Sequence, residues 1–228
     1  MLEGEDTLKL EYLNIKLIAV FSLIGLFFFM AIIIAMHILR PDYNPRSRYI
    51  SEYAVGKYGQ LAASSFVIYG LAILGIYLCL QTILPTRAHS NTGLAPIAIW
   101  GVCIAITGFF NVDLKDKQMS WHGTVHSIAS VIGVAASVIG LILLSFIFAL
   151  NESTQNVVFV TQIIAIVILI LAMLLFLGLL GDMALKYHHN VPVILLLFHN
   201  ITGLIERSLI GFSVVWLIII VNNLWHLE

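Results

Sequence analysis

Six long apolar stretches constrain this chain of 228 residues more than any other feature of its sequence. A helix needs about 20 mostly apolar residues to cross a bilayer, where every backbone polar group must find its partner within the protein. The stretches are Leu17–Leu39, Leu61–Leu84, Leu94–Phe110, Trp121–Leu150, Val157–Leu180 and Pro192–Val221. They lack the alternation of polar and apolar residues that is typical of membrane β-strands. We therefore predict an all-α fold, a polytopic membrane helix bundle with six transmembrane helices.

The composition excludes the main alternatives to a membrane protein. Only 10% of the residues are charged and 61% are hydrophobic, whereas a soluble domain has about 25% charged and about 45–50% apolar residues. The 11 basic residues are balanced by 12 acidic ones, so no basic surface points to nucleic acid as a partner. The partners we expect are membrane lipids. The sequence does not indicate an oligomeric state.

The spans divide the chain into an N-terminal tail (1–16), a six-helix transmembrane domain (17–221) and a C-terminal tail (222–228). Six spans place both termini on one side of the membrane. The loops after the first, third and fifth spans hold Arg40, Arg46, Arg48, Lys57, Lys115, Lys117 and Lys186, whereas the opposite side holds Lys9, Lys16 and Arg87. Because basic loops stay in the cytoplasm, we predict cytoplasmic odd-numbered loops and outward termini in a bacterial or archaeal plasma membrane.

Ionisable side chains within the spans gather in the half of the bundle that borders the odd-numbered loops. Such residues are costly in a bilayer and usually serve a function. His122 and His126 lie one turn apart on a stripe of small residues, which favours an inward-facing position. Glu206 and Arg207 fall near the middle of the last predicted span. We predict a pocket in this leaflet, formed by Ser51, Glu52, Asp113, His122, His126, His199, Glu206 and Arg207, with Asp113, Glu206 and Arg207 as the catalytic candidates.

The loop from Arg40 to Gln60 is the longest connection between spans. Tyr49, Ile50 and Tyr53 recur at helical spacing within it, opposite a polar face. This pattern predicts a short interfacial helix between the first two spans, with its tyrosines at the depth of the lipid headgroups. Such a helix would cover the polar pocket.

Several short motifs resemble one known family. They are Arg40-Pro41, Ile50-Ser51-Glu52-Tyr53-Ala54-Val55-Gly56, Gly108-Phe109-Phe110-Asn111-Val112-Asp113, the pair His122 and His126, and Gly203-Leu204-Ile205-Glu206-Arg207. In this order and spacing they resemble the multi-span membrane proteins catalogued as domain of unknown function 998. The resemblance covers nearly the whole chain. It implies an integral membrane protein of six to seven helices without an assigned activity.

Two classes of function fit the predicted pocket. In the first, the pocket binds a lipid or another small amphiphile. In the second, the chain is a metal-dependent hydrolase of a lipid amide or ester, with zinc held by His122, His126 and His199. Asp113 would then be a fourth ligand or a general base, and Arg207 would stabilise an oxyanion. This residue set is loosely similar to that of the alkaline-ceramidase group of membrane hydrolases.

A transporter or proton relay is a lesser alternative, which depends on Glu206 and Arg207 lying near the midplane. No inverted repeat accompanies it. A haem would need two histidines on different helices, for which His126 and His199 are the candidates, with His37 as another. Whether the chain is an enzyme is not decided by its sequence.

Overall fold

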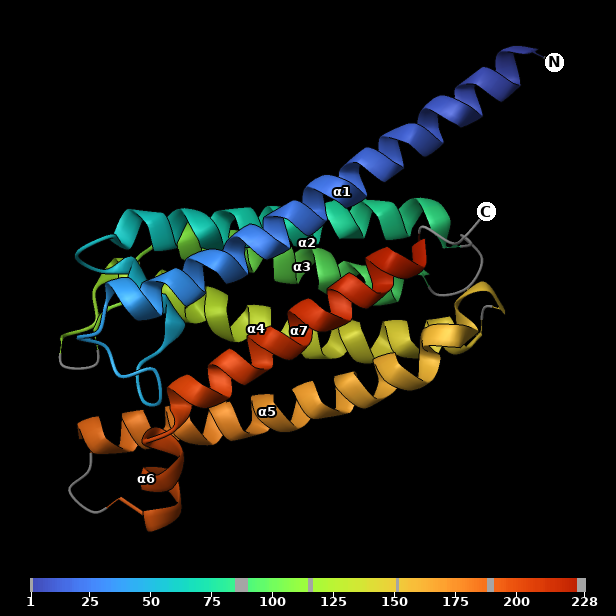
Figure 1. Ribbon diagram of the computed structural model, residues 1–228. Helices are drawn as coiled ribbons and strands as arrows, with labels where there is room; N and C mark the ends of the chain where they lie inside the picture. The colour runs from blue at the N-terminus through green and yellow to red at the C-terminus, as the bar shows by residue number, and fades with distance from the viewer. Residues whose placement is uncertain (1, 85–89, 115–116, 151, 188–190, 225–228) are drawn as a thin grey trace.

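The computed structural model describes residues 2–84, 90–114, 117–150, 152–187 and 191–224 (Figure 1). Within these ranges every regular element is a helix, and no strand occurs. The α-helices are α1 (Leu2–Leu39), α2 (Gly59–Ile83), α3 (Ser90–Phe109), α4 (Trp121–Ala149), α5 (Gln155–Tyr187), α6 (Val193–His199) and α7 (Thr202–Leu224), and two short 3-10 helices are η1 (Ile50–Ala54) and η2 (Glu152–Thr154). The predicted all-α class is confirmed.

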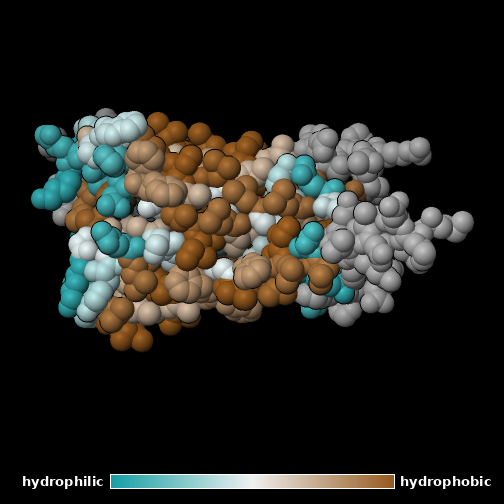
Figure 2. All heavy atoms as spheres, turned by 90° about the horizontal axis from the view of Figure 1, so that it is seen from above, coloured by the Kyte–Doolittle hydropathy of each residue, from teal (hydrophilic) through white to brown (hydrophobic). Residues whose placement is uncertain are grey.

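The helices have the length and surface of a membrane bundle. Five of them, α1, α2, α4, α5 and α7, are long and apolar enough to cross a membrane, and α3 has a shorter apolar part, Leu94–Phe109. On the face that Figure 2 shows, a broad apolar band covers the middle of the molecule, with hydrophilic side chains on either side of it. The start of α1 and the end of α7 lie at the same end of the bundle (Figure 1). We call the opposite end, where α1, α3 and α5 finish, the loop end.

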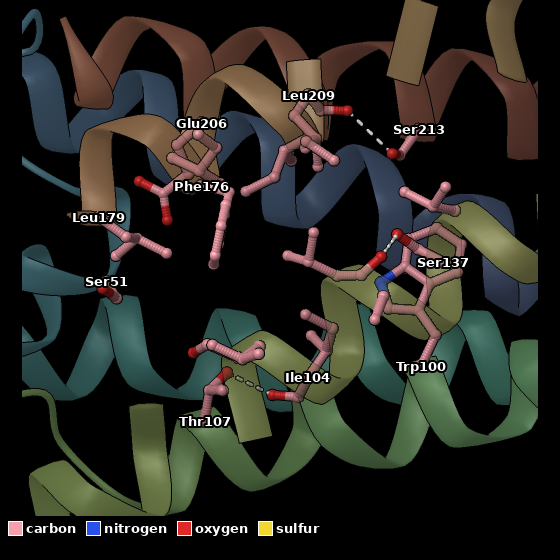
Figure 3. Close-up of a pocket in the computed structure, with 18 of the residues that line it drawn as sticks. Ser51, Trp100, Ile104, Thr107, Ser137, Phe176, Leu179, Glu206, Leu209 and Ser213 are labelled. Atoms are coloured by element: carbon pink, nitrogen blue, oxygen red, sulfur yellow. Dashed lines mark hydrogen bonds between the residues drawn. The ribbon is translucent and has the colours of Figure 1, made fainter. Parts of the chain in front are cut away.

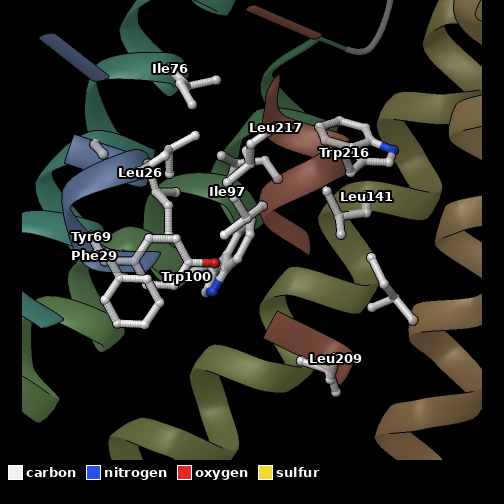
Figure 4. Packing of buried hydrophobic residues seen from close by; sticks show 14 of the residues in the cluster. Leu26, Phe29, Tyr69, Ile76, Ile97, Trp100, Leu141, Leu209, Trp216 and Leu217 are labelled. Atoms are coloured by element: carbon white, nitrogen blue, oxygen red, sulfur yellow. The ribbon is translucent and has the colours of Figure 1, made fainter. Parts of the chain in front are cut away.

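Each helix from α1 to α5 packs against the next one in the chain, and α7 packs mainly against α5. Side chains from five helices meet in the core (Figure 4). They are Leu26 and Phe29 of α1, Tyr69 and Ile76 of α2, Ile97 and Trp100 of α3, Leu141 of α4, and Leu209, Trp216 and Leu217 of α7. Because lipid is as apolar as these side chains, close packing rather than escape from water holds such helices together.

Most predicted boundaries agree with the structure to within a few residues. α1 ends at Leu39 as predicted, because Pro41 cannot continue the helical hydrogen bonding. At its other end α1 extends back to Leu2, so the predicted N-terminal tail is helical where the structure describes it. α5 continues to Tyr187, seven residues beyond the predicted Leu180.

The sixth predicted span, Pro192–Val221, is wrong as a single helix. It divides into α6 and α7 at Asn200 and Ile201, and Figure 1 shows α6 turned away from the direction of α7. The loop after α1 stabilises the new start, because Leu204 N–H donates to Arg46 O at 3.0 Å and the Thr202 hydroxyl donates to Ser47 O at 3.1 Å. Helix starts leave such backbone groups without intrahelical partners.

The short helix predicted between the first two spans is present as η1, but it does not lie on the surface. All five of its residues are buried, and the Tyr53 side chain has no exposed surface. The tyrosine therefore packs inside the loop end rather than at headgroup depth. The segment is buried because it packs mainly against α2 and also contacts the start of α7.

Candidate functional site

The segment from Arg40 to Tyr58 closes the loop end of the bundle, and we call it the cap. The Arg40 guanidinium, only 7% exposed, donates from Nη1 to Val55 O at 2.9 Å and to Lys57 O at 3.0 Å, which ties the two ends of the cap together. It also pairs with the Asp42 carboxylate at 2.8 Å. The hydrogen bond from Arg40 lowers the pKa of Asp42.

Arg207 attaches α7 to both the cap and α1. Its Nη1 donates to Arg48 O at 2.7 Å, and its Nε donates to His37 Nε2 at 2.9 Å. His37 Nδ1 lies 2.6 Å from Ile33 O and must donate to it, which leaves Nε2 as the acceptor for Arg207. The Arg207 guanidinium also lies 5.6 Å from the ring centre of Tyr53. Arg207 thus joins α1, the cap and α7 at one point.

Two carboxylates add to the contact between the cap and the helices. Glu206 Oε2 accepts a hydrogen bond from the Ile50 backbone N–H at 2.6 Å. Within the cap, Arg48 Nη1 pairs with Glu52 Oε2 at 3.1 Å, and the Glu52 side chain is 1% exposed. Of the predicted pocket residues, Glu52, Glu206 and Arg207 therefore meet around the cap.

A third carboxylate, Asp182 of α5, joins the cap to the end of α6. The Tyr49 hydroxyl donates to Asp182 Oδ2 at 2.6 Å, and His199 Nδ1 pairs with Asp182 Oδ1. Burial raises the pKa of Tyr49, and the charge of Asp182 raises it further. Sequence reasoning missed Asp182 because the fifth predicted span ended at Leu180. Had the fifth span been predicted to reach Tyr187, as α5 does, Asp182 would have been counted among the ionisable groups of the loop end.

The predicted residues at the start of α4 have partners of their own. Asp113 accepts hydrogen bonds from the Ser120 backbone N–H at 2.5 Å and from the Ser120 hydroxyl at 2.9 Å, while Ser120 caps α4 by accepting from Gly123 N–H. His122 is exposed beside the ring of Phe110. His126 is buried, with Nδ1 2.7 Å from Phe110 O.

The three histidines of the zinc hypothesis thus contact different groups. His122 lies beside an aromatic ring, His126 beside a backbone carbonyl and His199 beside Asp182. Across the described ranges no group of three His, Cys, Asp or Glu side chains has an arrangement that could hold a metal ion. The zinc hypothesis therefore finds no ligand set in this part of the chain.

The transport hypothesis placed Glu206 and Arg207 near the middle of a span, which is also wrong. The break in the sixth predicted span makes them the fifth and sixth residues of α7, beside the cap. Their place at the loop end follows from the contacts with Ile50 and Arg48 described above.

A cavity of about 720 Å³ lies beneath the cap, between α2, α3, α4, α5 and α7. Glu206 and Ser51 lie at one end of it, and Trp100 and Ser137 at the other (Figure 3). Most of its wall is aliphatic or aromatic. The polar residues in the wall are Tyr49, Ser51, Tyr69, Thr107, His126, Ser127, Ser130, Ser137, Glu206 and Ser213. Among the described lining residues, Glu206 is the only carboxylate and no lysine or arginine occurs.

The wall of this cavity includes side chains on the outside of the bundle. Val131 and Ile139 of α4 are 56% and 50% exposed, and Met173 and Phe176 of α5 are 57% and 58% exposed. The cavity therefore reaches the apolar flank that would face lipid. It has a polar end under the cap and an apolar rim along α4 and α5.

One comparison with known proteins identifies the family. The profile of a family described as protein of unknown function (DUF998) matches residues 23–222. The chain belongs to this family. The match covers the greater part of every span and all eight predicted pocket residues, so the DUF998 resemblance of the motifs is confirmed. No curated protein and no solved structure matches the chain.

Within this DUF998 fold, the eight predicted residues separate into three groups. Ser51, His126 and Glu206 line the cavity. Glu52, Arg207 and His199 belong to the contacts that hold the cap. Asp113 and His122 belong to the start of α4, outside the cavity wall.

Proposed function

We propose that the chain binds a single-chain amphiphile from the surrounding bilayer, with a cationic or hydrogen-bond-donating headgroup at Glu206. The observation that carries this proposal is a carboxylate at one end of a largely apolar cavity. Ligand cavities of about 300–1,000 Å³ with apolar walls and a few polar groups are typical of small-molecule sites. The volume of about 720 Å³ falls within that range.

The direction of entry supports a ligand that is dissolved in lipid. Exposed apolar side chains of α4 and α5 form part of the wall, so a hydrocarbon chain would pass from the bilayer into the cavity without crossing water. The headgroup would lie under the cap, beside Glu206 and Ser51. Because the described wall has no lysine or arginine, an anionic headgroup would lack the ammonium or guanidinium partner that a buried charge needs.

Binding of hexadecylamine, hexadecanol and palmitate to the purified protein in detergent tests the proposal. These probes share one chain length and differ in headgroup. We expect the amine to bind at least about tenfold more tightly than palmitate, a difference of about 1.4 kcal/mol. Glu206→Gln keeps an acceptor for the Ile50 N–H but removes the charge, so this preference should fall by about tenfold.

Glu152→Gln is the matched control, because Glu152 is an exposed carboxylate at the other end of the bundle. It should leave the preference unchanged. The proposal is overturned if no probe binds, or if Glu206→Gln keeps the full preference for the amine.

We also propose that the loop end faces the cytoplasm of a bacterial or archaeal plasma membrane. The excess of lysine and arginine in the odd-numbered loops supports this orientation. A cysteine at exposed Gln118 should react with an impermeant thiol reagent only after the cells are opened, whereas one at Glu152 should react in intact cells. The native Cys79 and Cys103 are buried and should not interfere. The reverse pattern would overturn the orientation.

A further inference from the structure

The wall of the cavity contains a buried hydroxyl group that has no hydrogen-bond partner among the described residues. Tyr69 of α2 is 1% exposed and lines the cavity. Its hydroxyl oxygen makes no hydrogen bond to any described residue. A buried hydroxyl without a partner destabilises the empty protein, so its retention needs an explanation.

The ring of Tyr69 is held in place from two sides. It stacks on Phe29, with ring centres 4.3 Å apart and planes 10° apart. It also meets Trp100 edge-on, at 6.1 Å and 89°. Figure 4 shows the hydroxyl directed towards Trp100, itself a lining residue. The hydroxyl is therefore a donor fixed in position before any ligand arrives.

Tyr69 lies deeper in the bundle than Glu206. α2 begins at the loop end with Gly59, ten residues before Tyr69, whereas α7 begins with Thr202, four residues before Glu206. At 1.5 Å per helical residue, the difference in depth is about 9 Å. A ligand whose headgroup contacts Glu206 would therefore place the middle of its chain opposite Tyr69.

Three other hydroxyl groups in the wall, those of Thr107, Ser137 and Ser213, use their protons within their own helices. Thr107 donates to Ile104 O at 2.7 Å, and Ser137 and Ser213 each donate to a backbone carbonyl of their own helix at 2.8 Å. These three hydroxyls can only accept a further hydrogen bond. Tyr69 differs from them, because its proton is free to be donated to a ligand.

We propose that the cavity selects amphiphiles that carry a keto, ether or hydroxyl oxygen about 9 Å below the headgroup, and that Tyr69 is the residue that recognises this oxygen. The inference rests on the proposed function, since it names the class of amphiphile that the same cavity takes. The ligand oxygen accepts from the Tyr69 hydroxyl, which removes the cost of leaving that hydroxyl unpaired.

The test compares hexadecylamine with an analogue of equal length that has a keto oxygen near mid-chain. Both probes are titrated into the wild-type protein and into Tyr69→Phe, which keeps the ring and its stacking on Phe29. One net hydrogen bond corresponds to about a fivefold change in affinity. We therefore expect the preference for the keto analogue to be about fivefold greater in the wild type than in Tyr69→Phe. Tyr77→Phe, on the same helix but outside the cavity wall, should keep the wild-type preference.

The thermal stability of the empty variant gives a second readout. Removing an unpaired hydroxyl should leave the melting temperature of Tyr69→Phe unchanged or higher, and a clear decrease would overturn the inference. An equal preference in both proteins also overturns it, while the proposed function stands if the amine still binds through Glu206. If neither probe binds the wild type, the proposed function itself fails, and this inference fails with it.

Discussion

Two helices, α4 and α7, begin at the loop end with similar polar residues but form different kinds of contact. The groups at the start of α4 have partners nearby in the sequence. Asp113 accepts from Ser120, and His126 contacts Phe110 O, sixteen residues away. The start of α4 could form from one stretch of chain, because the short loop before α4 contains the groups that complete the first turn of this helix.

The start of α7 depends on segments far away in the sequence. Arg207 contacts His37, 170 residues away, and Glu206 contacts Ile50, 156 residues away. The polar groups of α7 thus join α1, the cap and the last helix, whereas those of α4 complete a single helix end. The same types of residue therefore serve different purposes. At the start of α4 they cap one helix, and at the start of α7 they hold distant segments together at the loop end.

The largest loss of stability should come from a substitution that fills the space between α7 and the cap. A Cβ atom added at Gly203 would lie 2.3 Å from Arg48 O and 2.6 Å from Pro45 O, and these backbone atoms cannot move without shifting the cap. We expect Gly203→Ala to lower the free energy of unfolding by about 3 kcal/mol, measured by denaturation in detergent. Because Tyr49 and Ser51 would move with the cap, binding of hexadecylamine should weaken as well.

Gly211→Ala is the matched control on the same helix. No atom lies within 4 Å of a Cβ placed there, so this substitution should be neutral, or stabilising by up to about 1 kcal/mol through helix propensity. Equal stability of the two variants would show that the cap does not depend on close contact with α7.

The helices were predictable from the sequence because lipid requires long apolar runs with internal hydrogen bonds. The boundaries of α2 and α4 agree with the prediction to within two residues. The break between α6 and α7 was not predictable in the same way. The residues from Pro192 to Val221 are apolar enough for one span, and the hydrogen bonds that divide them come from Arg46 and Ser47 in a distant loop.

The candidate site was predicted in part for the same reason. The structure places the polar residues at the loop end, including Glu206 and Arg207, which were predicted near the middle of a span, and hydropathy does not show which of them share a partner. Asp113 and His126 are both predicted pocket residues, yet Asp113 accepts from the N-cap residue Ser120 while His126 lines the cavity. Tyr49 and Asp182 were missed because their contact joins segments 133 residues apart.

A substitution where the cap meets α5 should have an intermediate effect on the free energy of unfolding. Tyr49→Phe removes the 2.6 Å hydrogen bond to Asp182, which should lower the free energy of unfolding at pH 7 by about 2 kcal/mol, as for other bonds to charged groups. Because the pKa of Tyr49 is raised in the folded protein, this stabilisation is fully present below about pH 10, the pKa of an unperturbed tyrosine. Above that pH only the unfolded state loses the proton, so the advantage of the wild type should fall by about 1.4 kcal/mol per pH unit.

Tyr58→Phe is the control for alkaline effects of tyrosine in general, because Tyr58 is in the same segment but 42% exposed. Its stability relative to the wild type should not change with pH in this way. Denaturation series at pH 7, 10 and about 11 would measure all three proteins. A constant difference between the wild type and Tyr49→Phe over this range would contradict the proposed contact with Asp182.

The smallest effect should come from the start of α4, where the contacts are local. Ser120→Ala removes the hydroxyl that accepts from Gly123 N–H and donates to Asp113. The loss of such a helix cap typically costs about 1 kcal/mol. Because Ser120 lies outside the cavity wall, the affinity for hexadecylamine should stay at the wild-type value.

Ser64→Ala is the control, because it removes an exposed hydroxyl within α2. It should change the stability by less than about 0.5 kcal/mol. If Ser120→Ala weakened binding as strongly as Gly203→Ala, the two helix starts would act as one unit, and their distinction would be wrong.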